Sequence, residues 1–269
     1  MTARLTRAAF LDALTARGFP RTPRWHERWI ELGLIDRGNR PPGKASYTWP
    51  ATQLELAVTL LRQSAKGLSL GALPKIVVFV WLGWGDAYVP GRQIQRAMRT
   101  WARAEAEAPV RRVRATAADF VAHMAHKRGI GRRRLVRALT EFPAVNGEPE
   151  VLRDAFDAVF DPDARGIERG PAGAEMSSDR YFALIAARQR ASAHLGTYSA
   201  EQLDGARELY RQSRADYARL QPEYAADPDL GQMHPPVDAS ELADSACADL
   251  LDCLAMLFER GSGEPSPKP

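Results

Sequence analysis

A short basic helix is the clearest candidate for chemistry in this chain. Residues 21–35 read RTPRWHERWIELGLI and predict a helix over residues 22–32. Arg24 and Arg28 are four residues apart and share one face of that helix, and Arg21 directly precedes it. Guanidinium groups form bidentate hydrogen bonds with guanine, so this pattern favours a helix that reads the major groove of DNA.

The other residues of this helix are expected to cap its N-terminus, to pack in the core or to contact DNA. Thr22 is expected to cap the N-terminus, and as part of the reading surface it is counted among the DNA-binding residues. Trp25 and Trp29 are expected to anchor the helix in a core rather than to contact bases. His26 and Glu27 lie in the same helix and are open to base or backbone contact, and His26 is counted with the DNA-binding residues.

The segments on either side complete a helix-turn-helix with a wing. A helix that begins at Thr6 and stops at Gly18 precedes the basic helix. Residues 36–49, DRGNRPPGKASYTW, hold too much Gly and Pro for a helix and predict a two-stranded wing closed by Tyr47 and Trp49. Backbone contacts to DNA are expected from the wing residues Arg37, Arg40, Lys44 and Tyr47.

Ordinary surface positions remain an alternative for these cations. Arg24 and Arg28 would then form a solvated helix face, and Arg40 and Lys44 would be ordinary loop charges without a function. The same alternative holds for the arginine clusters of residues 111–114 and 132–134, which either extend the DNA footprint or end helices.

Charge is distributed unevenly along the 269 residues. Residues 1–142 contain 25 Lys and Arg against 10 Asp and Glu, a balance of +15, and residues 143–269 have a balance of −11. A basic half joined to an acidic half indicates that one end binds a polyanion and the other does something else.

Beyond the wing the chain reads as helical. Helices are predicted over residues 52–65, 69–83 and 90–108, with Ser69 capping the second and arginines on the outer side of the third. The predicted organisation is a winged helix-turn-helix domain (1–85), a basic helical extension suited to dimerisation (86–142), a linker (143–175), an acidic all-α domain (176–260) and a disordered tail (261–269). The fold class is therefore mainly α. Tyrosines at 181, 198, 210, 217 and 224 either pack between helices or line a ligand pocket.

Three short motifs in the first 85 or so residues resemble the winged-helix DNA-binding domain of the MerR family and its excisionase-like relatives. They are the helix ending Trp29-Ile30-Glu31-Leu32-Gly33-Leu34-Ile35, the wing segment Gly43-Lys44-Ala45-Ser46-Tyr47-Thr48, and the link from Leu61-Arg62 to Gly67-Leu68-Ser69-Leu70. The wing arginine usual in that family is replaced by Ala45 or Ser46, and its effector-binding cysteines are absent. The resemblance implies a homodimer in which each subunit engages one half-site of double-stranded DNA.

Several other classes of function find little support in the sequence. His123 and His126 have a helical i, i+3 spacing, but no carboxylate or cysteine completes a metal site, so no metal or other cofactor is expected. Cys247 and Cys253 are expected to be buried apolar residues. No catalytic constellation or phosphate loop appears, which argues against an enzyme. No signal peptide or membrane-spanning segment is visible, so a cytoplasmic protein is expected.

The sequence thus predicts a sequence-specific DNA-binding transcriptional regulator. Its acidic half would serve dimerisation or the sensing of a small-molecule or protein effector. Two alternatives are a recombination directionality or architectural factor that bends DNA, and an adaptor whose winged helix holds a protein.

Overall fold

The computed structural model describes residues 4–40, 42–43, 46–107, 114–115, 118, 130–141, 168–169, 175–176, 187–188, 190–226 and 238–259. Within these residues the protein is mainly α, as the sequence predicts. None of the helices described there is both long and apolar enough to cross a membrane.

Two short helices open the fold. Helix α1 (Arg7–Ala16) is capped by Thr6, whose hydroxyl accepts a hydrogen bond from the Ala9 amide, and it buries Phe10 and Leu14. A turn through Gly18, which has a φ of +83°, leads to α2 (Pro23–Glu31). The predicted starts and stops of both helices are confirmed to within a residue or two.

The wing segment has a different pairing from the predicted one. Strand β1 (Arg4–Thr6) pairs antiparallel with β2 (Thr48–Pro50), so the return arm of the wing joins the N-terminus of the chain. Between the two arms of the wing, the described residues form a single bridge, from Asn39 to Thr48. The return arm packs against the core through Trp49. The indole of this residue is buried and its N–H donates to the Asp36 carbonyl oxygen.

The central helices follow the wing. Helix α3 (Ala51–Ala65) is followed by α4 (Leu73–Trp84), the 3-10 turn η1 (Gly85–Ala87) and α5 (Gly91–Ala106). The prediction that Ser69 caps the second of these is wrong: the cap position lies three residues later, at Ala72, the helix begins at Leu73, and Pro74 lies in its first turn. Proline is well suited to a first turn, which explains the later start.

The remaining elements lie in the second half of the chain. They are α7 (Ile130–Glu141), the paired strands β3 (Glu168–Arg169) and β4 (Glu175–Met176), α10 (Ala200–Ala226) and α11 (Ala239–Glu259). The predicted tail, the two histidines at 123 and 126, and most of the predicted linker lie outside the described residues.

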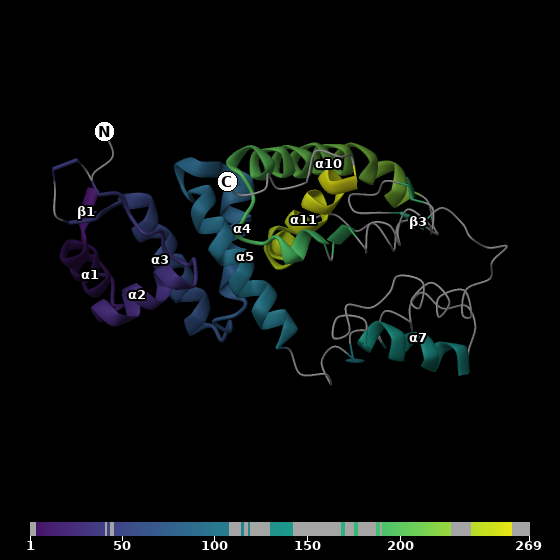
Figure 1. The fold of residues 1–269 in the computed structure, drawn as a ribbon, viewed down its shortest axis with the longest axis horizontal. Coiled ribbons are helices and arrows are strands. Elements are labelled where there is room, and N and C mark those ends of the chain that lie inside the picture. The colour runs from purple at the N-terminus through teal and green to yellow at the C-terminus, as the bar shows by residue number, and fades with distance from the viewer. Residues whose placement is uncertain are drawn as a thin grey trace.

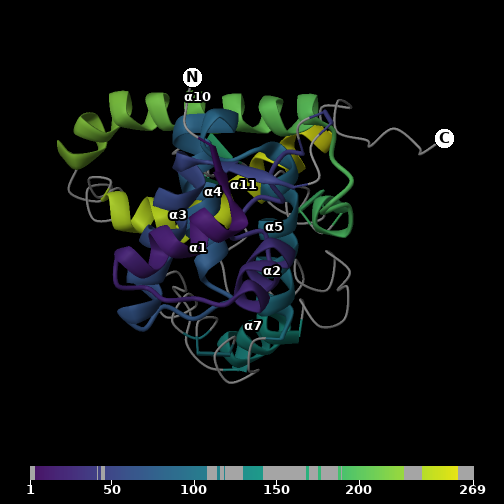
Figure 2. The same cartoon turned by 90° about the vertical axis from the view of Figure 1, so that its left-hand side faces the viewer.

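One hydrophobic core joins the two halves of the chain. Figure 1 shows α1, α2 and α3 at one end, α4 and α5 in the middle, and α10 and α11 beyond them. Figure 2 looks onto the first of these ends. Helix α4 packs against α5 on one side and α11 on the other, and a single buried cluster extends from Phe10 to Ala255. The predicted boundary at residue 85 is therefore not a break in packing.

Candidate nucleic-acid interface

Helix α2 is well built at both ends. The Thr22 hydroxyl accepts a hydrogen bond from the Trp25 amide at 3.3 Å, and Pro23 occupies the first turn. At the other end Gly33 takes a φ of +73°, a conformation that L side chains rarely adopt. The chain then turns inward, because Leu34 and Ile35 are fully buried.

The inner face of α2 is aromatic. Trp29 is buried and Trp25 stacks on it at a ring separation of 4.3 Å. His26 lies between Phe10 and Trp49, with ring centroids 5.1 Å and 4.7 Å away, respectively. These edge-to-face contacts fix the rotation of α2 about its own axis.

The assignment of His26 to the DNA surface is wrong. Its side chain is fully buried, and neither ring nitrogen has a hydrogen-bond partner among the residues that the structure describes. Burial and the nearby charge of Arg7 lower the pKa of His26 to about 4, so the ring is neutral at pH 7. It is a core aromatic residue that helical spacing from Trp29 (three residues) would have placed on the same face.

The outer face of α2 carries both signs of charge. Arg24 is exposed and makes no ion pair with any residue that the structure describes. Arg28 pairs with Glu31 at 3.2 Å, and Glu27 accepts from Arg7 of helix α1 at 2.8 Å. The two glutamates therefore offset much of the positive charge that the sequence pattern suggested.

Arg21 directly precedes Thr22, the cap residue of α2. Its guanidinium lies 5.6 Å from the centre of the Trp25 ring and donates to the Pro20 carbonyl oxygen at 2.8 Å. Both contacts are made by exposed or half-buried groups, so a ligand phosphate or base can replace them at little cost.

The wing presents its predicted contact residues to solvent where the structure describes them. Arg37, Arg40 and Tyr47 are exposed, and Tyr47 has 47% of its surface accessible. Lys44 lies outside the described residues. The base of the wing is closed by two backbone hydrogen bonds between Asn39 and Thr48, at 2.9 Å and 3.0 Å.

Sequence reasoning missed the group of residues that holds these parts together. Asp36, at the base of the wing, is buried and accepts from Arg92 of α5, whose Nε lies 2.8 Å from its Oδ1. Arg96, one turn further along α5, is nearly buried and lies 3.4 Å from the same carboxylate oxygen. Burial alone would raise the pKa of Asp36, but the hydrogen bonds and charge of Arg92 outweigh it and the pKa lies below its usual value.

The two arginines also bond to the backbone of both candidate surfaces. Arg96 donates to the Ile30 carbonyl oxygen near the end of α2 at 3.1 Å, and Arg92 donates to the Gly38 carbonyl oxygen in the wing at 3.1 Å. Because these donors are one turn apart on one helix, α5 fixes the end of α2 relative to the base of the wing. We refer to Asp36, Arg92 and Arg96 as the α5 clamp.

The clamp is backed by a fully bonded amide. Gln53 of α3 accepts from the Asp36 amide at 2.8 Å and donates to the Tyr88 carbonyl and to Gln93 at 2.8 Å and 2.9 Å. Gly33 lies so close to α5 that an added Cβ would fall 2.3 Å from the Ala97 nitrogen. The prediction that the arginines of this helix face outward is thus wrong for Arg96.

A weak signal for the clamp exists in the sequence. Arg92 and Arg96 are four residues apart, and Arg96 interrupts the apolar positions Ile94, Ala97 and Met98. A charged residue on a buried face needs a partner of opposite charge. Which carboxylate supplies it depends on tertiary structure, and periodicity carries no information about that choice.

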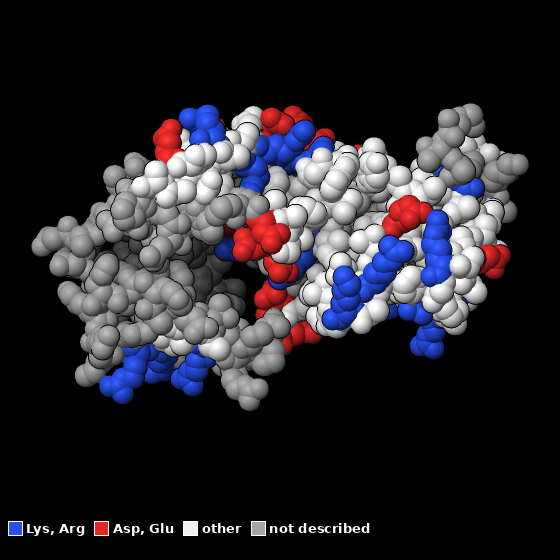
Figure 3. Space-filling model, turned by 180° about the vertical axis from the view of Figure 1, so that it is seen from behind, with Lys and Arg blue, Asp and Glu red and all other residues white. Residues whose placement is uncertain are grey.

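Basic and acidic side chains occupy different parts of the surface. Figure 3 views the molecule from behind, with the N-terminal elements at the right. Separate Lys and Arg side chains stand over that part, and acidic side chains gather near the middle of the molecule. On this face the cations are separate from one another rather than collected into one patch, as expected for contacts to the phosphate backbone.

Among the described residues no group of three or more His, Cys, Asp and Glu side chains is arranged to hold a metal ion. Cys247 and Cys253 are buried as predicted, and burial raises the pKa of both thiols. No protein-family model, curated protein or solved structure matches the chain.

Proposed function

We propose that this protein binds double-stranded DNA in a sequence-dependent way and acts as a transcriptional regulator. In this proposal α1 and α2 form a helix-turn-helix, α2 enters the major groove, and residues 36–49 form a wing on the phosphate backbone. The observation that carries it is the α5 clamp, which holds the end of α2 and the base of the wing in one fixed relation. Reading a duplex with two elements requires such a fixed relation, since groove and backbone are themselves at a set spacing.

Roles follow from exposure. Arg24 is exposed and unpaired within the described residues, so it is the first candidate for a base contact, with Arg21 and Arg28 beside it. Arg37, Arg40 and Lys44 would contact phosphates, and Tyr47 would lie against the backbone. The homodimer and its half-sites remain predictions, which light scattering and the symmetry of the bound sequence would test.

The test is salt-dependent binding of the full chain to DNA. We expect selection from a random-sequence pool to yield a defined site, and log K for that site to fall linearly with log salt. Arg24→Ala should weaken binding to the selected site by about 10-fold or more and barely affect random DNA. Arg37→Ala should weaken both about equally.

A charge-matched control separates these roles from a general loss of positive charge. Arg62→Ala removes the same charge from the exposed last turn of α3. If Arg24→Ala and Arg62→Ala weaken binding equally on both kinds of DNA, α2 does not read sequence. If no salt dependence is seen, DNA binding itself is ruled out.

A protein partner is the second candidate, and one observation favours it. Glu27 and Glu31 alternate with Arg24 and Arg28 on the exposed face of α2, which gives that face no net charge. Such a mixed face suits another protein better than a polyanion. Replacing both glutamates by glutamine separates the two functions, because it should strengthen DNA binding and weaken a protein complex.

A further inference from the structure

A small pocket lies on the seam between the two halves of the chain. Helix α4 contributes Phe79, Leu82 and Gly83, α10 contributes Tyr210, Arg211 and Arg214, and α11 contributes Leu242. Its volume is about 290 Å³, near the lower end of the roughly 300–1,000 Å³ range of small-molecule sites. No element of the candidate nucleic-acid interface lines it.

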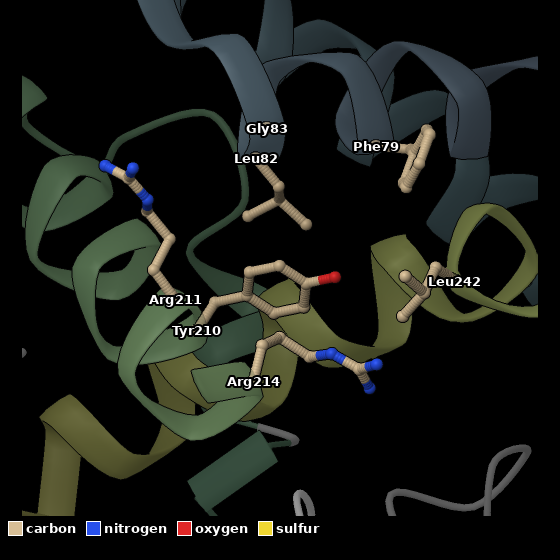
Figure 4. A pocket seen from close by; sticks show the side chains of 7 residues that line it. All are labelled: Phe79, Leu82, Gly83, Tyr210, Arg211, Arg214 and Leu242. Atoms are coloured by element: carbon tan, nitrogen blue, oxygen red, sulfur yellow. The ribbon is translucent and has the colours of Figure 1, made fainter. Parts of the chain in front are cut away.

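The pocket is lined by apolar side chains and, at one end, by a cationic side chain. In Figure 4 the Tyr210 ring lies between the side chains of Leu82 and Arg214, and its hydroxyl points toward Phe79 and Leu242. The Arg214 guanidinium lies on the same side as that hydroxyl, whereas Arg211 extends in the opposite direction. The pocket thus combines an apolar cavity with one guanidinium and one hydroxyl at the same end.

Both polar groups have bonding capacity to spare. The Tyr210 hydroxyl makes no hydrogen bond with any described residue, and burial raises the pKa of Tyr210, so the hydroxyl keeps its proton and can donate. Arg214 forms no ion pair within the described residues, and its guanidinium lies 5.5 Å from the centre of the Tyr217 ring.

The nearby acidic groups leave the pocket cationic. Asp249 of α11 is the carboxylate that acts electrostatically on both Tyr210 and Arg214. It already accepts a hydrogen bond from the Ser245 hydroxyl at 2.8 Å, and burial raises its pKa. A ligand that brings its own negative charge is therefore better matched to Arg214 than Asp249 is.

We propose that this pocket binds a small amphipathic carboxylate, with its apolar body against Phe79, Leu82 and Leu242 and its carboxylate on Arg214 and the Tyr210 hydroxyl. Arginine and carboxylate form parallel, charge-assisted hydrogen bonds, which are about twice as strong as neutral ones. The proposal concerns a site separate from α2 and the wing, and it stands whether or not the protein binds DNA.

The test is calorimetric titration of the full chain with octanoate and with its neutral analogue octanamide. We expect octanoate to bind with a stoichiometry of one and octanamide to bind about tenfold more weakly, which is the effect of losing one charge-assisted contact. Arg214→Gln should weaken octanoate binding by about tenfold and change octanamide binding by less than about twofold.

Two further variants make the result decisive. Arg219→Gln is the matched control, since it removes the same charge from an exposed position of the same helix that does not line the pocket. Leu242→Trp should fill the pocket and abolish binding of both compounds, with circular dichroism verifying the fold. Absence of octanoate binding, binding to many sites, or equal losses in Arg214→Gln and Arg219→Gln would overturn the proposal.

Discussion

The two sides of helix α4 handle buried charge in opposite ways. On the side of α5, Asp36 has two arginine neighbours and a pKa below its usual value. On the side of α11, burial raises the pKa of Asp252 to about 6, although Arg188 lies 3.1 Å away. Both carboxylates are nearly inaccessible, so the difference lies in their charged neighbours: Asp36 has two arginines, whereas Asp252 has one arginine and the like charge of Asp249.

The residues around Asp36 are therefore held in one geometry, whereas the packing around Asp252 is more adaptable. A buried network whose members are all bonded specifies a single arrangement, because any shift leaves a donor or acceptor unpaired. The buried part of the clamp, Asp36 with Arg96, has this property. The layer formed by α10 and α11 relies on apolar contact, and a half-paired carboxylate there tolerates displacement. A ligand pocket is compatible with the second region, and a rigid recognition surface with the first.

The largest effect should come from breaking the clamp. Asp36→Ala leaves Arg92 and Arg96 without their carboxylate, and removing one partner of a buried pair costs about 3–5 kcal/mol of unfolding free energy. Chemical denaturation of the full chain measures this loss. Glu55→Ala is the control, since the exposed pair of Glu55 with Arg17 should contribute less than about 1 kcal/mol. Equal losses of unfolding free energy in the two variants would show that the clamp contributes no more to stability than a surface ion pair does.

A glycine pair tests the close approach of α2 to α5. Gly33 and Gly18 both have positive φ, but only Gly33 faces a neighbouring backbone. Gly33→Ala adds a clash to the conformational strain and should lower the unfolding free energy by about 3 kcal/mol. Gly18→Ala has free space around its new Cβ and should lower it by only about 1 kcal/mol. If both variants unfold at the same denaturant concentration, α5 does not press against this turn.

Local signals explain what the sequence could predict here. Thr6, Thr22 and Pro23 act within one turn of helix, so their types alone place two helix starts. Ser69 carries the same kind of signal and fails, because Pro74 offers a competing start. The mainly α class follows from periodicity in the same local way.

The clamp and the pocket depend on contacts that no local pattern encodes. Asp36 and Arg92 are 56 residues apart, and Phe79 meets Tyr210 and Leu242 only once α4, α10 and α11 have packed together. His26 shows the converse problem. Its position in the basic helix suggested a DNA contact, but its spacing from Trp29 was the more reliable guide to its burial.

Acid should weaken the N-terminal region through His26. The pKa of this residue is about 4 in the folded protein and about 6.5 when unfolded. The unfolded chain therefore binds more protons between these values, and the free energy of unfolding falls as pH falls through that window, by roughly 3 kcal/mol. Urea unfolding across this range measures it. The leucine of the His26→Leu variant cannot be protonated, so its unfolding free energy should lack this contribution. If the variant and the natural sequence have the same pH profile, the His26 ring is exposed to water.

Asp252 should give the opposite and smaller dependence on pH. Its pKa is about 6 in the folded protein against an ordinary value of 3.8, so the folded state holds the extra proton and stability falls as pH rises through this range. Asp252→Asn cannot ionise, and its unfolding free energy relative to that of the natural sequence should increase by about 1 kcal/mol from pH 5 to pH 8. His26→Leu leaves this increment intact, because the two groups lie in different parts of the core. If Asp252→Asn shows no such increase, the carboxylate is as well paired as Asp36, and the contrast between the two sides of α4 disappears.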